Sequence, residues 1–245
     1  MIYNINGDKV LADTTAETFE GKKMVILGDS ISDSTGYRET HTDKFWFEFI
    51  AEKLGVSWVS LAESGKGYYA AGIVNGQRGD RDIIRAQVPD IPEDVDVILI
   101  MAGANDAAVV NRPWAGSPPL GDVGDTDPDT SFCGVLYQTC NTILNQHPNA
   151  QLGIITPPPM AGTNSALLPP IADTIKAFCE HYSYACFELN KNSGMVVEND
   201  GQNTLMFTDG VHPNHYGNEV MAVVLEDWVR MLFRKSKIET GGGSV

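Results

Sequence analysis

The stretch DVILIMAGAND, residues 96–106, decides the fold class of this chain. Its apolar run is continuous rather than alternating, which is typical of a strand buried on both faces in the middle of a parallel sheet. The run ends in Gly-Ala-Asn-Asp, a polar turn that directly follows the strand. Ligands of open parallel sheets bind at the carboxyl ends of the strands, so this turn marks where a site is expected.

Short apolar strands alternate with helical patterns on both sides of this stretch. Besides residues 96–106, strands are expected at 24–30, 57–63, 151–159 and 184–189. Helices are expected at 44–55, 81–88, 132–147, 166–182 and 215–235. About five strands alternating with helices predict an α/β fold of three layers, in which helices cover both faces of a central parallel sheet.

Length and composition indicate one domain. The chain has 245 residues, of which 42% are hydrophobic, and this suffices for one sizeable core. We expect an N-terminal extension over residues 1–20, a domain over 21–237 and a flexible tail over 238–245, which ends in GGGSV.

The charge balance limits the possible partners. With 17 basic and 32 acidic residues the net charge is −15, which argues against nucleic acid or an anionic membrane as the main partner. The N-terminus lacks a basic start followed by an apolar run, so no secretory signal is expected. No stretch approaches the ~18 apolar residues of a membrane span, and membrane insertion is not expected. A cytoplasmic location is the default expectation, and membership of a larger surface or phage protein is the alternative.

The sequence offers no strong metal or cofactor motif. Cys133 and Cys140, like Cys179 and Cys186, are seven positions apart, which is not a zinc-ribbon spacing, and buried free thiols are expected. The glycines of SGKGYYAAG, residues 64–72, have the wrong spacing for a dinucleotide-binding loop. We therefore expect a function that needs neither cofactor nor metal.

A candidate catalytic group combines the first strand with a loop near the end of the chain. The strand at 24–30 runs into Gly28 and then Ser30, whose hydroxyl is a poor nucleophile unless a base accepts its proton. The loop FTDGVHPNHYG, residues 207–217, supplies His212 as that base and Asp209 to orient it, and Pro213 should stiffen the loop.

Acyl transfer also needs hydrogen-bond donors for the oxyanion that develops on the substrate. Asn105 ends the strand at 96–106 and can donate a side-chain N–H. Gly65 follows the strand at 57–63 and can donate its backbone N–H without a side chain in the way. The backbone N–H of Ser30 would be the third donor.

Four sequence blocks, in this order, resemble those of the SGNH hydrolases of the GDSL esterase/lipase superfamily: ILGDSIS, VSLAESGKG, AGAND and TDGVHPN. The resemblance extends from about residue 24 to the final helix. It implies a flavodoxin-like three-layer fold, Ser30 as nucleophile, Asp209 and His212 as the rest of a triad, and Gly65 and Asn105 as oxyanion donors. Two features depart from the pattern: Ser60 stands where Asn is common, and Gly67 follows Gly65 closely enough to be the alternative donor.

Other polar residues near these blocks receive structural or binding interpretations. We expect Asp29 and Asp106 to accept hydrogen bonds from loop N–H groups, and Asp29 is also a candidate for substrate binding. The Gly/Pro/Asp-rich loop at 112–132 should overhang the crevice, where Trp114 would shape the substrate pocket. Its aspartates at 122, 125, 127 and 129 do not match the spacing of an EF-hand, so a solvated acidic loop is expected rather than a calcium site.

The remaining histidines near the motifs are not expected to act. His215 is expected at the start of the closing helix. His41 and His181 have no supporting neighbours in the sequence and are expected at the surface or at the edge of the core.

These observations predict a serine esterase that hydrolyses a short-acyl ester through an acyl-enzyme. Acetyl on a carbohydrate is the favoured substrate, within the wider class of small-molecule or glycan esters. A lipase, lysophospholipase or thioesterase of the same family is an alternative. A non-catalytic carbohydrate-binding domain of a larger protein is the alternative from another class.

Overall fold

The computed structural model of the chain describes residues 2–3, 9–10, 17–36, 38, 40–69, 73–74, 77–78, 86–108, 110, 119–162 and 165–239. Most of the helix expected at 81–88 lies outside these residues, and so does Trp114.

Five parallel strands form the central sheet. They are β3 (Lys23–Gly28), β4 (Ser57–Ser60), β7 (Val97–Met101), β8 (Gln151–Ile155) and β9 (Ala185–Phe187). Their order across the sheet is β4-β3-β7-β8-β9, and every neighbouring pair is parallel. Numbered along the chain this is 2-1-3-4-5, the flavodoxin-like order, with a topological switch point between β3 and β7. The expected fold class is confirmed.

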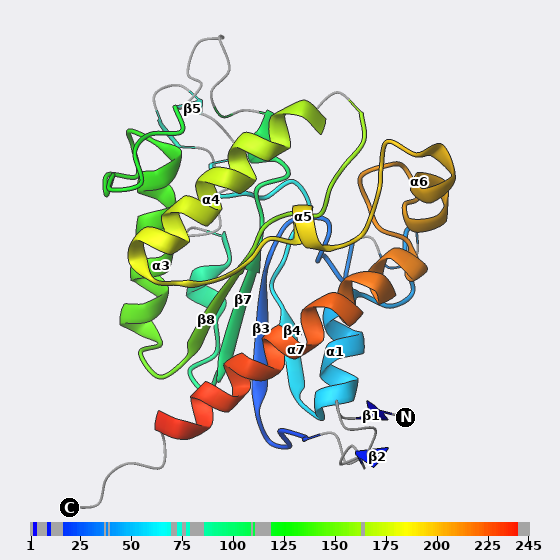
Figure 1. The fold of residues 1–245 in the computed structure, drawn as a ribbon. Coiled ribbons are helices and arrows are strands. Elements are labelled where there is room, and N and C mark those ends of the chain that lie inside the picture. The colour runs from blue at the N-terminus through cyan, green and yellow to red at the C-terminus, as the bar shows by residue number, and fades with distance from the viewer. Residues whose placement is uncertain are drawn as a thin grey trace, which may run out of the picture.

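Four helices within the described residues cover the sheet: α1 (Trp46–Leu54), α3 (Phe132–Gln146), α4 (Leu168–Tyr182) and α7 (His215–Glu239). Figure 1 shows α1 and α7 together on one side of the sheet and α3 and α4 together on the other. None of the described helices combines the length and apolar character that a membrane-spanning segment needs.

The helix ends follow local capping chemistry. The Glu48 carboxylate accepts a hydrogen bond from the backbone N–H of Phe45, just before α1, and the helix ends at Gly55 in the left-handed conformation, as the sequence predicts. Ser131 caps α3 through a bond from the N–H of Gly134.

The structure also describes several short elements. They are β1 (Ile2–Tyr3), β2 (Lys9–Val10), β5 (Ile73–Val74), β6 (Gln77–Arg78), the 3-10 turns η1 (Val88–Asp90), η2 (Asp106–Ala108) and η3 (Ser165–Leu167), α5 (Leu189–Asn192) and α6 (Asp200–Met206). Helix α6 was not expected from its polar sequence, yet Asn199 caps it by accepting the N–H of Gln202.

The N-terminal boundary of the folded body lies before residue 21. Phe19 is buried with its ring centroid 5.3 Å from that of Phe233 in α7. Glu17 bonds to the Arg234 guanidinium at 2.7 Å. Residues 17–20 therefore pack as part of the domain. The boundary expected between the domain and a flexible tail, after residue 237, remains a proposal.

The strands end earlier than the sequence patterns suggest, and for β3 a close approach of two backbones accompanies this end. A Cβ on Gly28 would lie 2.3 Å from the carbonyl oxygen of Met101 in β7, which only glycine avoids. The residues that follow Gly28 therefore start a loop at the edge of the sheet.

A second close approach sets the distance between α7 and the sheet. A Cβ on Gly153 in β8 would lie 2.7 Å from Trp228 and 2.8 Å from Leu232, both on α7. Gly153→Ala is therefore expected to lower the free energy of unfolding by about 1–3 kcal/mol through overpacking.

Denaturant unfolding of Gly153→Ala and Gly124→Ala measures this effect. A Cβ on Gly124 meets no atom within 4 Å, so the control is expected to stay within about 0.5 kcal/mol of wild type. Equal stability of the two variants would contradict close packing of α7 on β8.

Candidate active site

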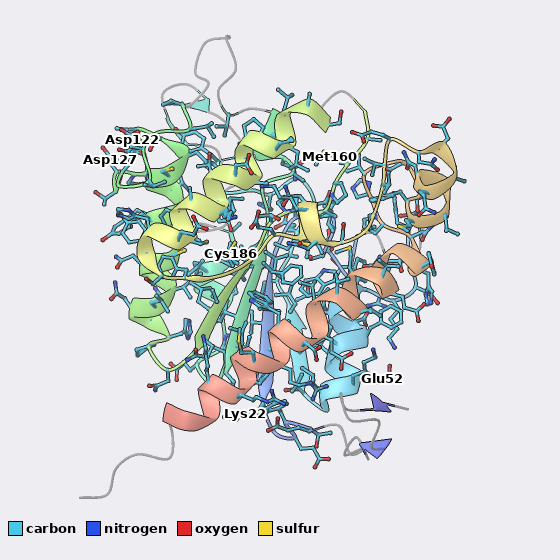
Figure 2. The ribbon with its side chains drawn as sticks, in the orientation of Figure 1. Lys22, Glu52, Asp122, Asp127, Met160 and Cys186 are labelled. Atoms are coloured by element: carbon cyan, nitrogen blue, oxygen red, sulfur yellow. The ribbon has the colours of Figure 1, made fainter. Side chains whose placement is uncertain are left out.

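A pocket of about 400 Å³ opens at the carboxyl end of the sheet. Its lining includes Ser30 from the loop after β3, Asn105 from the loop after β7 and His212 from the loop before α7. Met160, which also lines the pocket, lies in Figure 2 at the opposite end of the sheet from Lys22, the residue that precedes β3. The pocket therefore sits beside the switch point between β3 and β7, where the fold class favours ligand binding.

Two hydrogen bonds join three side chains that are far apart in the sequence. His212 Nε2 lies 2.8 Å from Ser30 Oγ, and His212 Nδ1 lies 2.7 Å from Asp209 Oδ2. Both distances lie within hydrogen-bonding range, and the order is that of a nucleophile, a base and an orienting carboxylate. The structure thus brings together the three residues that the sequence singled out.

The loop that carries Asp209 and His212 is closed at its base. Phe207 and Pro213 form an antiparallel bridge, and the N–H of Thr208 donates to the carbonyl of His212 at 2.9 Å. At the tip, Gly210 adopts a positive φ of 81°, which allows the tight turn between the two functional side chains.

Hydrogen bonds keep Asp209 ionised. Its partial burial alone would raise the pKa, but the backbone N–H and the imidazole of His212 both donate to the carboxylate, as does the N–H of Val211. Together these bonds lower the pKa of Asp209 to about 2. The carboxylate therefore carries its charge throughout the neutral pH range and can stabilise a protonated His212.

The expected oxyanion donors lie on the pocket wall. Gly65 has a positive φ of 78° and lines the pocket with Asn105, whereas Gly67 is not among the described lining residues. The Asn105 side chain donates one N–H to the carbonyl of Lys66 at 2.8 Å. That bond fixes the orientation of the amide, whose second N–H remains available to a ligand.

Two buried polar side chains that the sequence reasoning missed hold the loops around Ser30. Gln87 bonds to both backbone groups of Gly28, accepting its N–H at 2.8 Å and donating to its carbonyl at 2.6 Å. Asp33 accepts the N–H of Gly36 in its own loop and that of Ser64 in the loop after β4, at 2.8 and 3.0 Å. The GDSISDS motif contains Asp33, but nothing in it reveals a partner 31 positions away.

The two aspartates beside the site residues face the interior. Asp106 accepts the backbone N–H groups of Tyr68 and Tyr69, and Asp29 accepts that of Ile31, so the acceptor role expected of both is confirmed. Burial raises the pKa of Asp29 to about 7 and that of Asp106 to about 6. Asp29 is fully buried behind the pocket, so its expected contact with substrate is not available in this arrangement.

Ser60, which replaces a common Asn of the family pattern, has its own local partner. Its hydroxyl donates to the backbone carbonyl of Ser32 at 2.9 Å. The short side chain of Ser60 therefore links β4 to the loop that carries Ser30.

His41 lies at the site, and this corrects the expectation of an isolated residue at the surface or core edge. Its ring packs edge-on against that of His212, with centroids 4.7 Å apart, and its Nε2 lies 3.6 Å from Asp209 Oδ2. No sequence signal could have revealed this contact, because 168 positions separate His41 from Asp209 and no local motif surrounds it.

The other sequence expectations concern residues away from the pocket. His215 begins α7, as expected. The four cysteines are free thiols, three of them buried. In the acidic loop Asp125 accepts bonds from the N–H of Asp122 and from Ser131, so the described carboxylates act as turn acceptors and form no cluster of metal ligands.

Solved structures with the same fold include three relatives of low sequence identity. A protein from Lactobacillus plantarum is 24% identical, with a TM-score of 0.68, and the alignment covers 87% of this chain and 98% of that one. A carbohydrate acetylesterase family member from Sinorhizobium meliloti is 19% identical, with a TM-score of 0.60 and coverage of 86% and 99%. The acetyl xylan esterase AlAXEase is 17% identical, with a TM-score of 0.60 and coverage of 85% and 98%.

Comparison with curated proteins finds no match. The family model for the GDSL-like lipase/acylhydrolase family, in contrast, matches residues 26–220. This range starts within β3 and ends within α7, so it includes every strand of the central sheet except the first residues of β3. The chain therefore belongs to the GDSL-like lipase/acylhydrolase family.

Proposed function

We propose that the protein is a serine esterase that hydrolyses a short-acyl ester, with acetyl groups on a carbohydrate as the favoured substrate. The hydrogen-bonded chain from Ser30 through His212 to Asp209, open to a pocket at the switch point of the sheet, is the observation that carries this proposal. Membership of an ester-hydrolysing family supports it.

In the first half of the reaction, Ser30 Oγ attacks the ester carbonyl carbon while His212 Nε2 accepts the hydroxyl proton. The carbonyl oxygen takes up the negative charge and receives hydrogen bonds from the N–H groups of Ser30, Gly65 and Asn105. The bond to the alcohol then breaks, and His212 gives its proton to the departing alcohol oxygen. The acyl group stays on Ser30.

In the second half, water replaces the alcohol. His212 Nε2 accepts a proton from the water as its oxygen attacks the acyl carbon. The second tetrahedral intermediate uses the same three donors, and its collapse releases the carboxylic acid and returns the proton to Ser30 Oγ. Asp209 stays ionised throughout and stabilises the imidazolium in both halves.

The size and walls of the pocket favour a small acyl group. A volume of about 400 Å³ lies near the lower end of the range for ligand sites, ~300–1,000 Å³. The described walls combine the short side chains of Ala104 and Ala161 with the polar groups of Ser64 and Asn105. One of the similar structures is named as a carbohydrate acetylesterase family member and another as an acetyl xylan esterase, which supports the choice of a sugar as the alcohol.

Hydrolysis of p-nitrophenyl esters from acetate to decanoate tests both parts of the proposal. We expect kcat/KM to be highest for acetate and to fall with chain length. We expect Ser30→Ala to lower kcat by at least about 10³-fold, because no nucleophile remains.

Ser34→Ala is the matched control, since Ser34 lies in the same loop but does not line the pocket, and it should retain wild-type activity. Equal activity of wild type and Ser30→Ala would refute Ser30 as nucleophile. A kcat/KM that rises with the length of the acyl chain would favour a lipase over an acetylesterase.

Asp209→Asn tests the electrostatic role of the carboxylate separately from its shape. Because the pKa of Asp209 is about 2, the native side chain is charged across the working pH range, and Asn removes this charge at nearly constant volume. We expect kcat to fall by about 10³–10⁴-fold, as in other triads. A loss below about tenfold at pH 7, with the fold intact by circular dichroism, would show that Asp209 is not needed to support His212.

A further inference from the structure

Three potential metal ligands meet at the edge of the pocket. His41, Asp209 and His212 each offer one donor atom, and these atoms lie within 4.8 Å of one another. No other such group of three occurs among the described residues. The hydrolytic cycle described above uses Asp209 and His212 but gives His41 no task.

The separations of the two imidazoles from Asp209 are close to those of a zinc site. Asp209 Oδ2 is the shared atom: it lies 2.7 Å from His212 Nδ1 and 3.6 Å from His41 Nε2. A tetrahedral Zn²⁺ with bonds of about 2.0–2.1 Å separates neighbouring ligand atoms by about 3.3 Å. To accommodate the ion, the first distance must widen and the second shorten slightly, and the two imidazole nitrogens, which lie within 4.8 Å of each other, must reach the same separation.

The neighbourhood of His41 suits a ligand histidine. Thr40 Oγ1 lies 2.6 Å from His41 Nδ1 and can accept its proton, which leaves the lone pair of Nε2 on the side of Asp209. Such an outer hydrogen bond is the usual way in which proteins fix the tautomer of a metal-binding imidazole. The edge-on contact with His212 holds the two rings together.

A dissolved cation can reach the group. The side chains of His41 and His212 are 17% and 16% exposed, and that of Asp209 is 45% exposed. The net charge of −15 also favours the approach of cations. Two imidazoles and one carboxylate form a donor set typical of Zn²⁺, with a fourth position left for water.

We propose that Zn²⁺ binds reversibly to His41, Asp209 and His212 and thereby switches the hydrolase off. The ion takes the place of the proton that His212 Nδ1 shares with Asp209. With the metal on Nδ1, the neutral imidazole carries its proton on Nε2, which can then no longer accept the proton of Ser30. The ion also occupies the carboxylate that would stabilise the imidazolium. The binding claim stands on geometry alone, whereas the inhibition claim rests on the proposed esterase function.

Isothermal titration calorimetry with ZnCl₂ tests the binding claim without any need for turnover. Wild type and Ser30→Ala are both expected to bind one Zn²⁺ with similar affinity, because Ser30 is not a ligand. His41→Phe keeps a ring against His212 but removes both nitrogens. It should weaken binding at least about tenfold, a loss that even outer-shell changes produce at metal sites.

His41→Asn serves as a second variant if His41→Phe does not fold. His215→Ala is the matched control, because His215 is a nearby surface histidine with its own carboxylate partner, Asp43, at 2.5 Å. Its affinity for Zn²⁺ should equal that of wild type. Unchanged affinity in both His41 variants, or loss of binding in His215→Ala instead, would overturn the proposed site.

Ester hydrolysis at increasing Zn²⁺ then tests inhibition, with each variant normalised to its own rate without the metal. Wild type should be inhibited and should recover on addition of EDTA, while Mg²⁺, which prefers oxygen ligands, should have no effect. The half-inhibiting concentration should rise at least about tenfold in His41→Phe. Zinc binding by a protein without esterase activity would refute the proposed function and leave the metal site standing. Active enzyme that binds no zinc would refute the metal site alone.

Discussion

β3 pairs in parallel with β7 over five residues, from Met24 beside Val97 to Gly28 beside Met101. The other strands of the central sheet add outward from this pair, β4 on one side and β8 with β9 on the other. The crossover connections consequently leave in opposite directions, and the loops after β3 and β7 separate instead of covering one another. That separation provides the space in which the loops with Ser30 and Asn105 face the same pocket, and it makes the remaining geometry possible.

The chemistry of the site depends on backbone groups as much as on side chains. Asp209 is held ionised largely by N–H groups of its own loop, while Gln87 fixes the backbone of Gly28 next to the nucleophile. Because these bonds are formed before any substrate arrives, little reorganisation is needed during the reaction. His41 brings a second imidazole to the same carboxylate, so the arrangement that supports proton transfer also presents ligands to a metal ion.

Local patterns in the sequence predict the strands, most long helices and the positions of Ser30, Asp209 and His212, because strand ends and turn residues determine these features over short distances. They do not predict Asp33, Gln87 or His41, whose partners become neighbours only when the sheet assembles. They also extend the strands into the loops: the strand expected at 24–30 ends at Gly28, where a Cβ would meet the carbonyl oxygen of Met101, a contact between strands that the local pattern does not reveal. The inward orientation of Asp29 likewise depends on burial that no neighbouring residue reveals.

The central claim is that His212 and Asp209 activate Ser30 as a nucleophile. Intact-protein mass spectrometry after treatment with a fluorophosphonate tests it most directly, because this reagent forms a stable bond with an activated serine. The account predicts one adduct per chain, located on Ser30 by peptide mapping and absent when the labelling is repeated with His212→Ala. Labelling at another serine, or ester hydrolysis by a protein whose Ser30 stays unmodified and whose activity survives the reagent, would contradict it.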